Sequence, residues 1–137
     1  MKLDSAILDV GSGKGNLLYH LNLAGFNNLT GIDPYIDENI IYTEELRVIK
    51  GGIEDLTVKN LKFNLILFNY SFEHIANPLE ILQNARQLQN AGDNIIVRIP
   101  VAILINCPII GNISNMLPAM PKITAIIDKV IEVFKIF

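Results

Sequence analysis

Three glycines alternate with other residues directly after a short apolar run, in the stretch LDVGSGKG. Glycine has no Cβ and adopts positive φ freely, so a turn built from Gly11, Gly13 and Gly15 lets a ligand contact the backbone. Residues 6–10 before it read as a buried parallel strand, and residues 14–24 after it carry leucines near helical spacing. The stretch therefore predicts a strand-to-helix turn of the kind at which open α/β sheets bind ligands.

Apolar runs alternate with helical patterns along the rest of the chain. They predict strands at residues 28–33, 46–50, 63–69 and 94–100, and a weak helix or a loop at 36–45. The clearest helix begins at Pro78, with Asn77 as its N-cap, and Gly92 ends it. This alternation predicts an α/β fold, with a doubly wound, mainly parallel sheet and helices on both faces.

The composition limits the class of protein. A chain of 137 residues has the length of one domain, and half of it is apolar, which suffices for a substantial core. A net charge of −3 and a pI near 5.3 disfavour a nucleic-acid-binding protein, which would carry a basic face. The single cysteine, Cys107, fits a reducing, cytoplasmic location. The N-terminus does not read as a signal peptide, and Arg98 and two prolines interrupt the longest apolar region, so no membrane span is expected.

The residues around the glycines narrow the type of ligand. A mononucleotide phosphate loop requires Ser or Thr after its lysine, whereas Gly15 follows Lys14. A dinucleotide site favours glycine where this chain has Asn16, so that fit is poor. An adenosyl ligand without phosphate fits best. The second predicted strand ends at Asp33, about twenty residues after the glycines, where an acid accepts hydrogen bonds from both ribose hydroxyls.

Together these segments resemble class I S-adenosylmethionine-dependent methyltransferases. The resemblance covers residues 6–100 and is carried in order by ILDVGSGKG, GIDPY, GGIEDL, FNLILFNYSFEHIANP and LQNARQLQNAGDNIIVRIP. It implies a Rossmann-like methyltransferase fold, S-adenosyl-L-methionine as the cofactor and no metal. It also implies a cofactor-binding core at residues 1–100, with residues 101–137 as a divergent part of the same domain.

The resemblance assigns cofactor contacts to the carboxyl ends of the first two strands. Gly11 and Gly13 would lie under the methionine and the ribose. Asp9 would orient the turn and the amino group. Asp33 would hold the ribose hydroxyls. The other residues implied in this part of the site are Ser12, Gly15 and Pro34.

The stretch after the third strand would bracket adenine. Ile53 would offer its backbone N–H and an apolar face, and Glu54 or Asp55 would accept a hydrogen bond from the exocyclic amine. Gly52 stands where many relatives have an acid, which is a departure from the family pattern.

The end of the fourth strand would meet the methionine end of the cofactor through Asn69 and Tyr70, although many relatives have Asp in place of Asn69. His74 is the candidate general base, because imidazole titrates near neutral pH. The pair Glu73-His74 fits equally a structural role that orients the following loop. Methyl transfer depends mainly on alignment, so the sequence names no acceptor beyond a small molecule.

The C-terminal part departs from the family's usual continuation, which leaves open whether the last strands of the sheet are present. Residues 101–121 are apolar and punctuated by prolines. Residues 122–137, KITAIIDKVIEVFKIF, predict an amphipathic helix. Its apolar side would be Ile123, Ile126, Ile127, Val130, Val133, Phe134 and Phe137. This helix would pack on the sheet or, alternatively, form a contact with a second copy, a partner or a membrane surface.

The leading hypothesis is a methyltransferase that uses S-adenosylmethionine and a small-molecule acceptor. The alternative is a degenerate, non-catalytic or partner-dependent domain that binds the cofactor or a protein. The short apolar C-terminal segment and the departures at Gly52 and Asn69 favour that alternative. An NAD-dependent oxidoreductase is disfavoured by Asn16.

Overall fold

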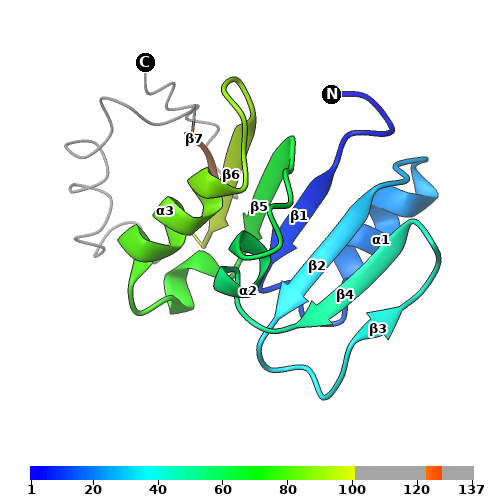
Figure 1. The fold of residues 1–137 in the computed structure, drawn as a ribbon, viewed down its shortest axis with the longest axis horizontal. Helices are drawn as coiled ribbons and strands as arrows, with labels where there is room; N and C mark the ends of the chain where they lie inside the picture. Colours follow the sequence, from blue (N-terminus) through cyan, green and yellow to red (C-terminus); the bar gives the residue numbers. More distant parts are fainter. Residues whose placement is uncertain (101–122, 128–137) are drawn as a thin grey trace.

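A computed structural model describes residues 1–100 and the backbone of residues 123–127 (Figure 1). Its strands form one sheet in the order β3-β4-β2-β1-β5-β6-β7. Their bounds are Ile7–Val10 (β1), Leu29–Asp33 (β2), Ile40–Ile41 (β3), Leu46–Lys50 (β4), Leu65–Asn69 (β5), Asn94–Ile99 (β6) and Ile123–Ile127 (β7). Neighbouring strands run parallel except β3 and β4, which are antiparallel. The predicted α/β fold with a mainly parallel sheet is confirmed.

Helices cover both faces of this sheet. They are α1 (Asn16–Leu23), α2 (Glu54–Thr57) and α3 (Pro78–Gln87), with a short 3-10 helix η1 at Phe72–His74. In Figure 1, α1 lies behind the sheet, and α2 and α3 lie in front of it. Successive strand residues point to opposite faces. Ile7 therefore packs with Leu18 of α1, whereas Leu8 shares the other core with Leu56 of α2 and Leu82 of α3.

The five strands predicted in the first hundred residues all form, with ends that differ by at most about two residues. Residues 36–45 form the short strand β3 and turns, so the loop alternative was the better one. Hydrogen bonds from the backbone to side chains of this segment disfavour a helix here. Asn39 Oδ1 accepts a hydrogen bond from Lys50 N, and Thr43 Oγ1 accepts from Leu46 N. Such side-chain bonds to the backbone compete with helical hydrogen bonds.

The helix predicted over residues 122–137 is wrong at Ile123–Ile127, which forms strand β7. This strand pairs in parallel with β6, from Ile95 opposite Ile123 to Ile99 opposite Ile127. Its run of β-branched residues suits a strand, and the free edge of β6 supplies the hydrogen-bonding partner. The apolar side proposed for that helix therefore does not exist at these residues. The rest of the predicted helix, and residues 101–122, lie outside the described residues.

The sheet thus continues past β6, so a strand that the sequence left in doubt is present. Across the described part of the chain, no helix combines the length and hydropathy that a membrane crossing requires.

Candidate functional site

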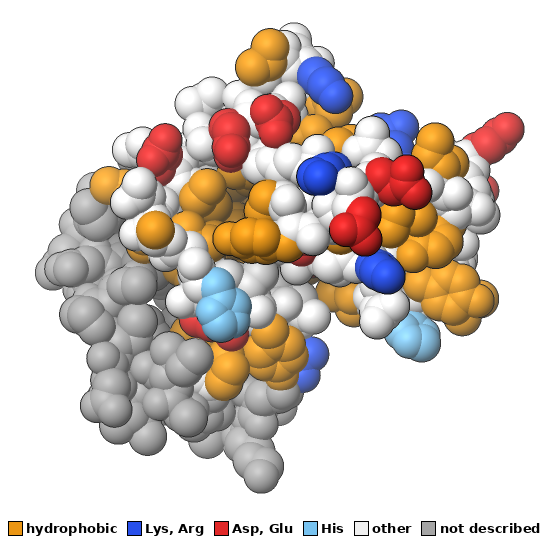
Figure 2. Space-filling model, turned by 90° about the horizontal axis from the view of Figure 1, so that it is seen from below, with side chains coloured by type: hydrophobic (Ala, Val, Ile, Leu, Met, Phe, Trp, Pro, Cys, Tyr) orange, Lys and Arg blue, Asp and Glu red, His pale blue; other side chains and the backbone are white. Residues whose placement is uncertain are grey.

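A cleft of about 420 Å³ opens at the carboxyl ends of the parallel strands, which is where open α/β sheets bind ligands. Five segments line it: the ends of β1 and β2, the turn from β4 into α2, the loop that follows β5, and α3 through Ile81. Figure 2 looks at this edge of the sheet and shows hydrophobic side chains around a hollow, with acidic side chains on its rim. We call this site the carboxyl-end cleft.

Most of the residues predicted from the sequence meet at this cleft. Those that line it are Gly11, Asp33, Pro34, Ile53, Glu54, Tyr70 and His74. Asp9, Ser12 and Asn69 lie next to lining residues in the chain but do not line the cleft themselves, and Gly13 and Gly15 lie further along the same turn, also outside the lining. The side chain of Ser12 packs over Gly31, and Gly15 approaches Val48 of β4. A cofactor contact of these residues stays a prediction.

The turn at residues 11–15, the glycine turn, needs glycine for two different reasons. Gly11 has a φ of +72°, and a Cβ there would overlap the Cβ of Ser71. Ser71 cannot move aside easily, because its Oγ donates a hydrogen bond to the Val10 carbonyl at 2.5 Å. Gly13 has a φ of +55°, and open space surrounds the place where its Cβ would stand. Gly11 therefore permits a close approach within the protein, whereas Gly13 leaves backbone accessible.

Asp33 joins the glycine turn to the end of β2. Its Oδ2 accepts a hydrogen bond from the Gly13 N–H, and its Oδ1 accepts one from the Tyr35 N–H, both at 2.8 Å. Asp33 as a residue is only 8% exposed, yet it lines the cleft. A carboxylate has about four acceptor positions, so roughly two remain for the hydroxyl groups of a ligand.

The loop after β5 forms the opposite wall of the cleft. Tyr70 has a φ of +57°, an uncommon conformation for a residue other than glycine. Its N–H donates to the Arg98 carbonyl at 2.9 Å, and the Arg98 guanidinium lies 4.6 Å from the centre of its ring. Strained residues of this kind gather at functional sites. The same wall carries Ser71 and His74.

Tyr35 and Ser71 are among the residues of the cleft that the sequence did not predict. Tyr35 stands on its rim with 93% of its surface exposed, and Ser71 fills the space that Gly11 leaves. An aromatic residue shortly after the strand-end acid was a usable signal for Tyr35. Nothing in the sequence marked Ser71, because its partner Val10 lies 61 residues away.

A family model described as "Methyltransferase domain" matches residues 2–103. The chain belongs to this methyltransferase family. Human EEF1A lysine methyltransferase 2 is 33% identical over 94 residues, which are 62% of this chain and 40% of that protein. The crystal structure of the plantazolicin methyltransferase BpumL, in complex with a triazolic desmethylPZN analog and SAH, shares the fold at a TM-score of 0.51 and 23% identity. That match covers 63% of this chain and 35% of BpumL, so the chain spans less than half the length of either relative.

Beneath the glycine turn, the methyltransferase domain buries a second acid. Asp9 is 2% exposed, and its Oδ1 is buried with no hydrogen-bond partner. Burial first, and then the nearby Asp33 carboxylate, raise the pKa of Asp9 from 3.8 to about 7. A buried polar atom without a partner needs an explanation, and an adjacent cationic group of a ligand would supply one.

Asp9 predicts a pH dependence of stability. The folded protein keeps a proton that the unfolded chain releases, so the free energy of unfolding should fall as the pH rises from about 4 to about 7. Asp9→Asn removes this titration but keeps a buried polar group. We therefore expect the free energy of unfolding of Asp9→Asn to exceed that of the wild type by about 1–2 kcal/mol at pH 8 and by less at pH 5. Urea unfolding at the two pH values measures this, with the exposed Asp4→Asn as control. A wild type that gains stability over Asp9→Asn as the pH rises would contradict the burial argument.

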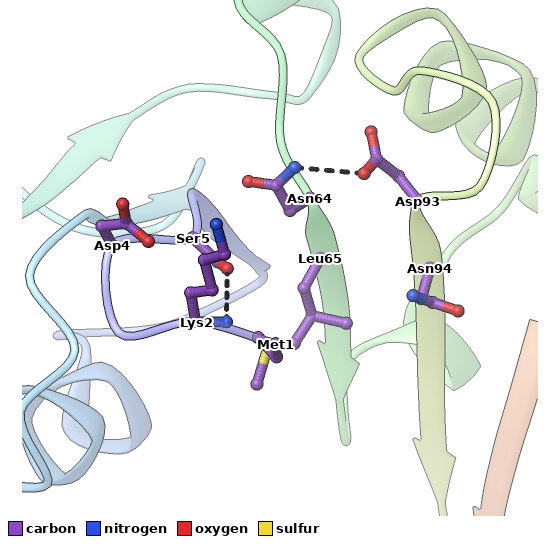
Figure 3. Close-up of a pocket in the computed structure, with 8 residues that line it drawn as sticks. All are labelled: Met1, Lys2, Asp4, Ser5, Asn64, Leu65, Asp93 and Asn94. Carbon is purple, nitrogen blue, oxygen red and sulfur yellow. Dashed lines mark hydrogen bonds between the residues drawn. The ribbon is translucent and has the colours of Figure 1, made fainter.

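A second hollow, the amino-end hollow, lies at the opposite edge of the sheet (Figure 3). Its volume is about 500 Å³, and its lining includes Met1, Lys2, Asn64 and Asp93. Two hydrogen bonds join polar groups of its lining: Asn64 Nδ2 donates to Asp93 Oδ1 at 3.1 Å, and Lys2 N donates to Ser5 Oγ at 2.9 Å. It holds none of the predicted site residues, so we assign function to the smaller carboxyl-end cleft. Among the described residues, no group of three or more His, Cys, Asp and Glu side chains could hold a metal ion.

Proposed function

We propose that this methyltransferase domain binds S-adenosyl-L-methionine in the carboxyl-end cleft and transfers its methyl group to a small-molecule acceptor. The observation that carries the proposal is the bond from the Gly13 N–H to Asp33 Oδ2. It holds the carboxylate that we propose for the ribose hydroxyls against the glycine turn. The SAH bound in the BpumL crystal structure is further support, because that protein shares this fold.

The charges of the cleft also support a cofactor without phosphate. Asp33 and Glu54 are the carboxylates among its described lining residues, and that lining contains no Lys or Arg. An anionic wall disfavours a dinucleotide or a triphosphate and favours a ligand with cationic groups. Asp9, whose Oδ1 has no partner, would stabilise the amino group of the methionine.

Each part of the chain would then have a separate task. Gly11 and Gly13 present backbone to the ligand, Asp33 accepts from the ribose hydroxyls, and Ile53 lies against the base. Asn69 and Tyr70 would meet the methionine end. The bound cofactor supplies an activated methyl group on a sulfonium, so the protein's share is alignment and exclusion of water. His74 lines the cleft and would take up the proton that an acceptor loses.

A lysine side chain of a protein is the second candidate acceptor. The human relative, 33% identical, is named a lysine methyltransferase. Incubating the protein with tritiated cofactor and a cell extract, then separating small molecules from proteins, distinguishes the two. We expect label in the small-molecule fraction. Label confined to lysine in the protein fraction would replace the small-molecule proposal, and no label in either fraction would favour the non-catalytic alternative.

Calorimetric titration with S-adenosylmethionine and S-adenosylhomocysteine tests the cofactor proposal, with NAD⁺ and ATP as competing ligands. We expect saturable binding of S-adenosylmethionine and S-adenosylhomocysteine, and no binding of NAD⁺ or ATP. Gly13→Asp should weaken it at least about tenfold, or roughly 1.4 kcal/mol, because the new side chain enters the open space at the turn.

Gly92→Asp is the matched control, since Gly92 also has positive φ and open surroundings but lies away from the cleft. It should bind as the wild type does. A folded wild type that binds neither adenosyl ligand would contradict the proposal. Equal losses of affinity in Gly13→Asp and Gly92→Asp would contradict it as well.

A further inference from the structure

The two edges of the sheet differ in how they are protected. β3 stands at one edge and β7 at the other. β3 is only two residues long, and four acids stand close to it in the chain: Asp37, Glu38, Glu44 and Glu45. A short edge strand among charges is a common protection against pairing with another chain. The longer β7 lacks this protection, because its sequence, ITAII, contains no charge and no proline.

The composition of β7 is that of a strand inside a sheet. Strands in the interior of a parallel sheet are near-continuous apolar runs rich in β-branched residues. On one side, β7 pairs in parallel with β6, from Ile95 to Ile99. On its other side, no strand of the described residues pairs with it. An edge of this kind is a template for the addition of one more strand.

The sequence around β7 is complementary to itself. Lys122 stands directly before the strand, and Asp128 stands directly after it. If two copies pair antiparallel about a two-fold axis at Ala125, Ile123 of one copy lies opposite Ile127 of the other. The same register sets the lysine of each copy against the aspartate of the other, once at each end. Opposite charges that face each other across two strands stabilise their pairing, whereas like charges destabilise it.

We propose that two copies of this chain associate through their β7 strands, antiparallel and centred on Ala125, and so join their two sheets into one. Two-fold contacts of a surface with its own copy are the commonest interfaces of soluble oligomers. A parallel pairing in register would instead set the two copies of Lys122 against each other. The described lining of the carboxyl-end cleft includes no residue of β7, so this interface is independent of the cofactor proposal.

Sedimentation velocity of the full chain at micromolar to submillimolar concentrations measures the association. We expect a concentration-dependent dimer of about twice 15.3 kDa. Lys122→Glu should weaken it at least about tenfold, because like charges then face each other at both ends, and Asp128→Lys should do the same. The variant with both substitutions should associate as the wild type does, since opposite charges face each other again. Lys59→Glu, the same change at an exposed lysine after α2, should have no effect.

Disulfide cross-linking tests the register, in a Cys107→Ser background that removes the single native thiol. A cysteine at Ala125 would lie opposite its copy, with Cα atoms about 4.5–5.5 Å apart, which a disulfide can span. A cysteine at Ile123 would lie four residues along the strand from its copy, about 13 Å away, which is too far. We therefore expect Ala125→Cys to form a covalent dimer under mild oxidation and Ile123→Cys to stay uncrosslinked.

Each outcome supports or overturns the interface. A wild type that stays monomeric, a dimer that both single charge reversals leave intact, or no recovery in the double variant overturns it. Cross-linking of Ile123→Cys in preference to Ala125→Cys overturns it as well. None of these results affects the proposed function, because cofactor binding is measured separately. Should a cysteine variant fail to fold, the charge reversals, which lie outside the strand, decide the question alone.

Discussion

Asp33→Ala is expected to weaken the binding of S-adenosylhomocysteine by roughly a hundredfold or more, as measured by calorimetry. The carboxylate positions the glycine turn through the Gly13 N–H and the following loop through the Tyr35 N–H. In the proposed complex, it also accepts from the ribose hydroxyls. Loss of a charged acceptor costs about 1.5–3 kcal/mol, and the two released N–H groups add to that figure; a hundredfold corresponds to about 2.8 kcal/mol.

Two controls separate the ligand contact from the damage to the turn. Asp37→Ala removes an exposed acid from the same loop and should leave the affinity unchanged. The 2′-deoxy analogue of the ligand should bind the wild type several-fold less tightly than the parent compound, but bind Asp33→Ala as well as the parent does. If the deoxy analogue loses as much affinity in Asp33→Ala as in the wild type, Asp33 does not contact the ribose.

Gly11→Ala is expected to lower the free energy of unfolding by about 3 kcal/mol or more in urea denaturation. A residue with a Cβ at a φ of +72° costs about 1–2 kcal/mol. The new Cβ would also overlap that of Ser71, which is fixed by its bond to the Val10 carbonyl.

Gly92→Ala provides the comparison, because Gly92 has a φ of +92° and no neighbour near its missing Cβ. Its free energy of unfolding should fall only by the cost of the backbone conformation, about 1–2 kcal/mol. Adding Ser71→Gly to Gly11→Ala should restore part of the lost stability by removing the overlapping atom. Equal losses in Gly11→Ala and Gly92→Ala would show that the close contact with Ser71 contributes nothing.

The features that the sequence predicted well depend on residues close together in the chain. The apolar runs of β1, β2, β4, β5 and β6 stand between turn residues, and each run buries side chains on the sheet as a parallel strand does. The glycine turn and Asp33 were found because their spacing follows from one strand–helix–strand unit. The bond from the Gly13 N–H to the Asp33 carboxylate joins the two as that spacing implies.

Contacts between distant segments could not be predicted in the same way. Periodicity assigned a helix to Ile123–Ile127, because the free edge of β6 that it pairs with is invisible in a local pattern. The positive φ of Tyr70 depends on its place beside Arg98 of β6. The close approach of Ser71 to Gly11 depends on where the loop after β5 meets the end of β1, at the Val10 carbonyl.

The glycine at position 52 illustrates a second kind of limit. In the sequence, Gly52 stands where many relatives have an acid, and this departure favours a degenerate domain. In the structure, the carboxylate of Glu54 lies in the space of that missing side chain. Which of two acids after a turn is free and which one closes it depends on side-chain geometry, here the bond from the Gly52 N–H to Asp55.

Amide chemical shifts of ¹⁵N-labelled protein, recorded during titration with S-adenosylhomocysteine, test most directly whether the carboxyl-end cleft holds the cofactor. We expect saturable shifts that are largest at Gly13, Tyr35 and Ile53, with smaller ones at Ser71. Shifts concentrated at Asn64 and Asp93 of the amino-end hollow, or none at millimolar ligand, would contradict the assignment.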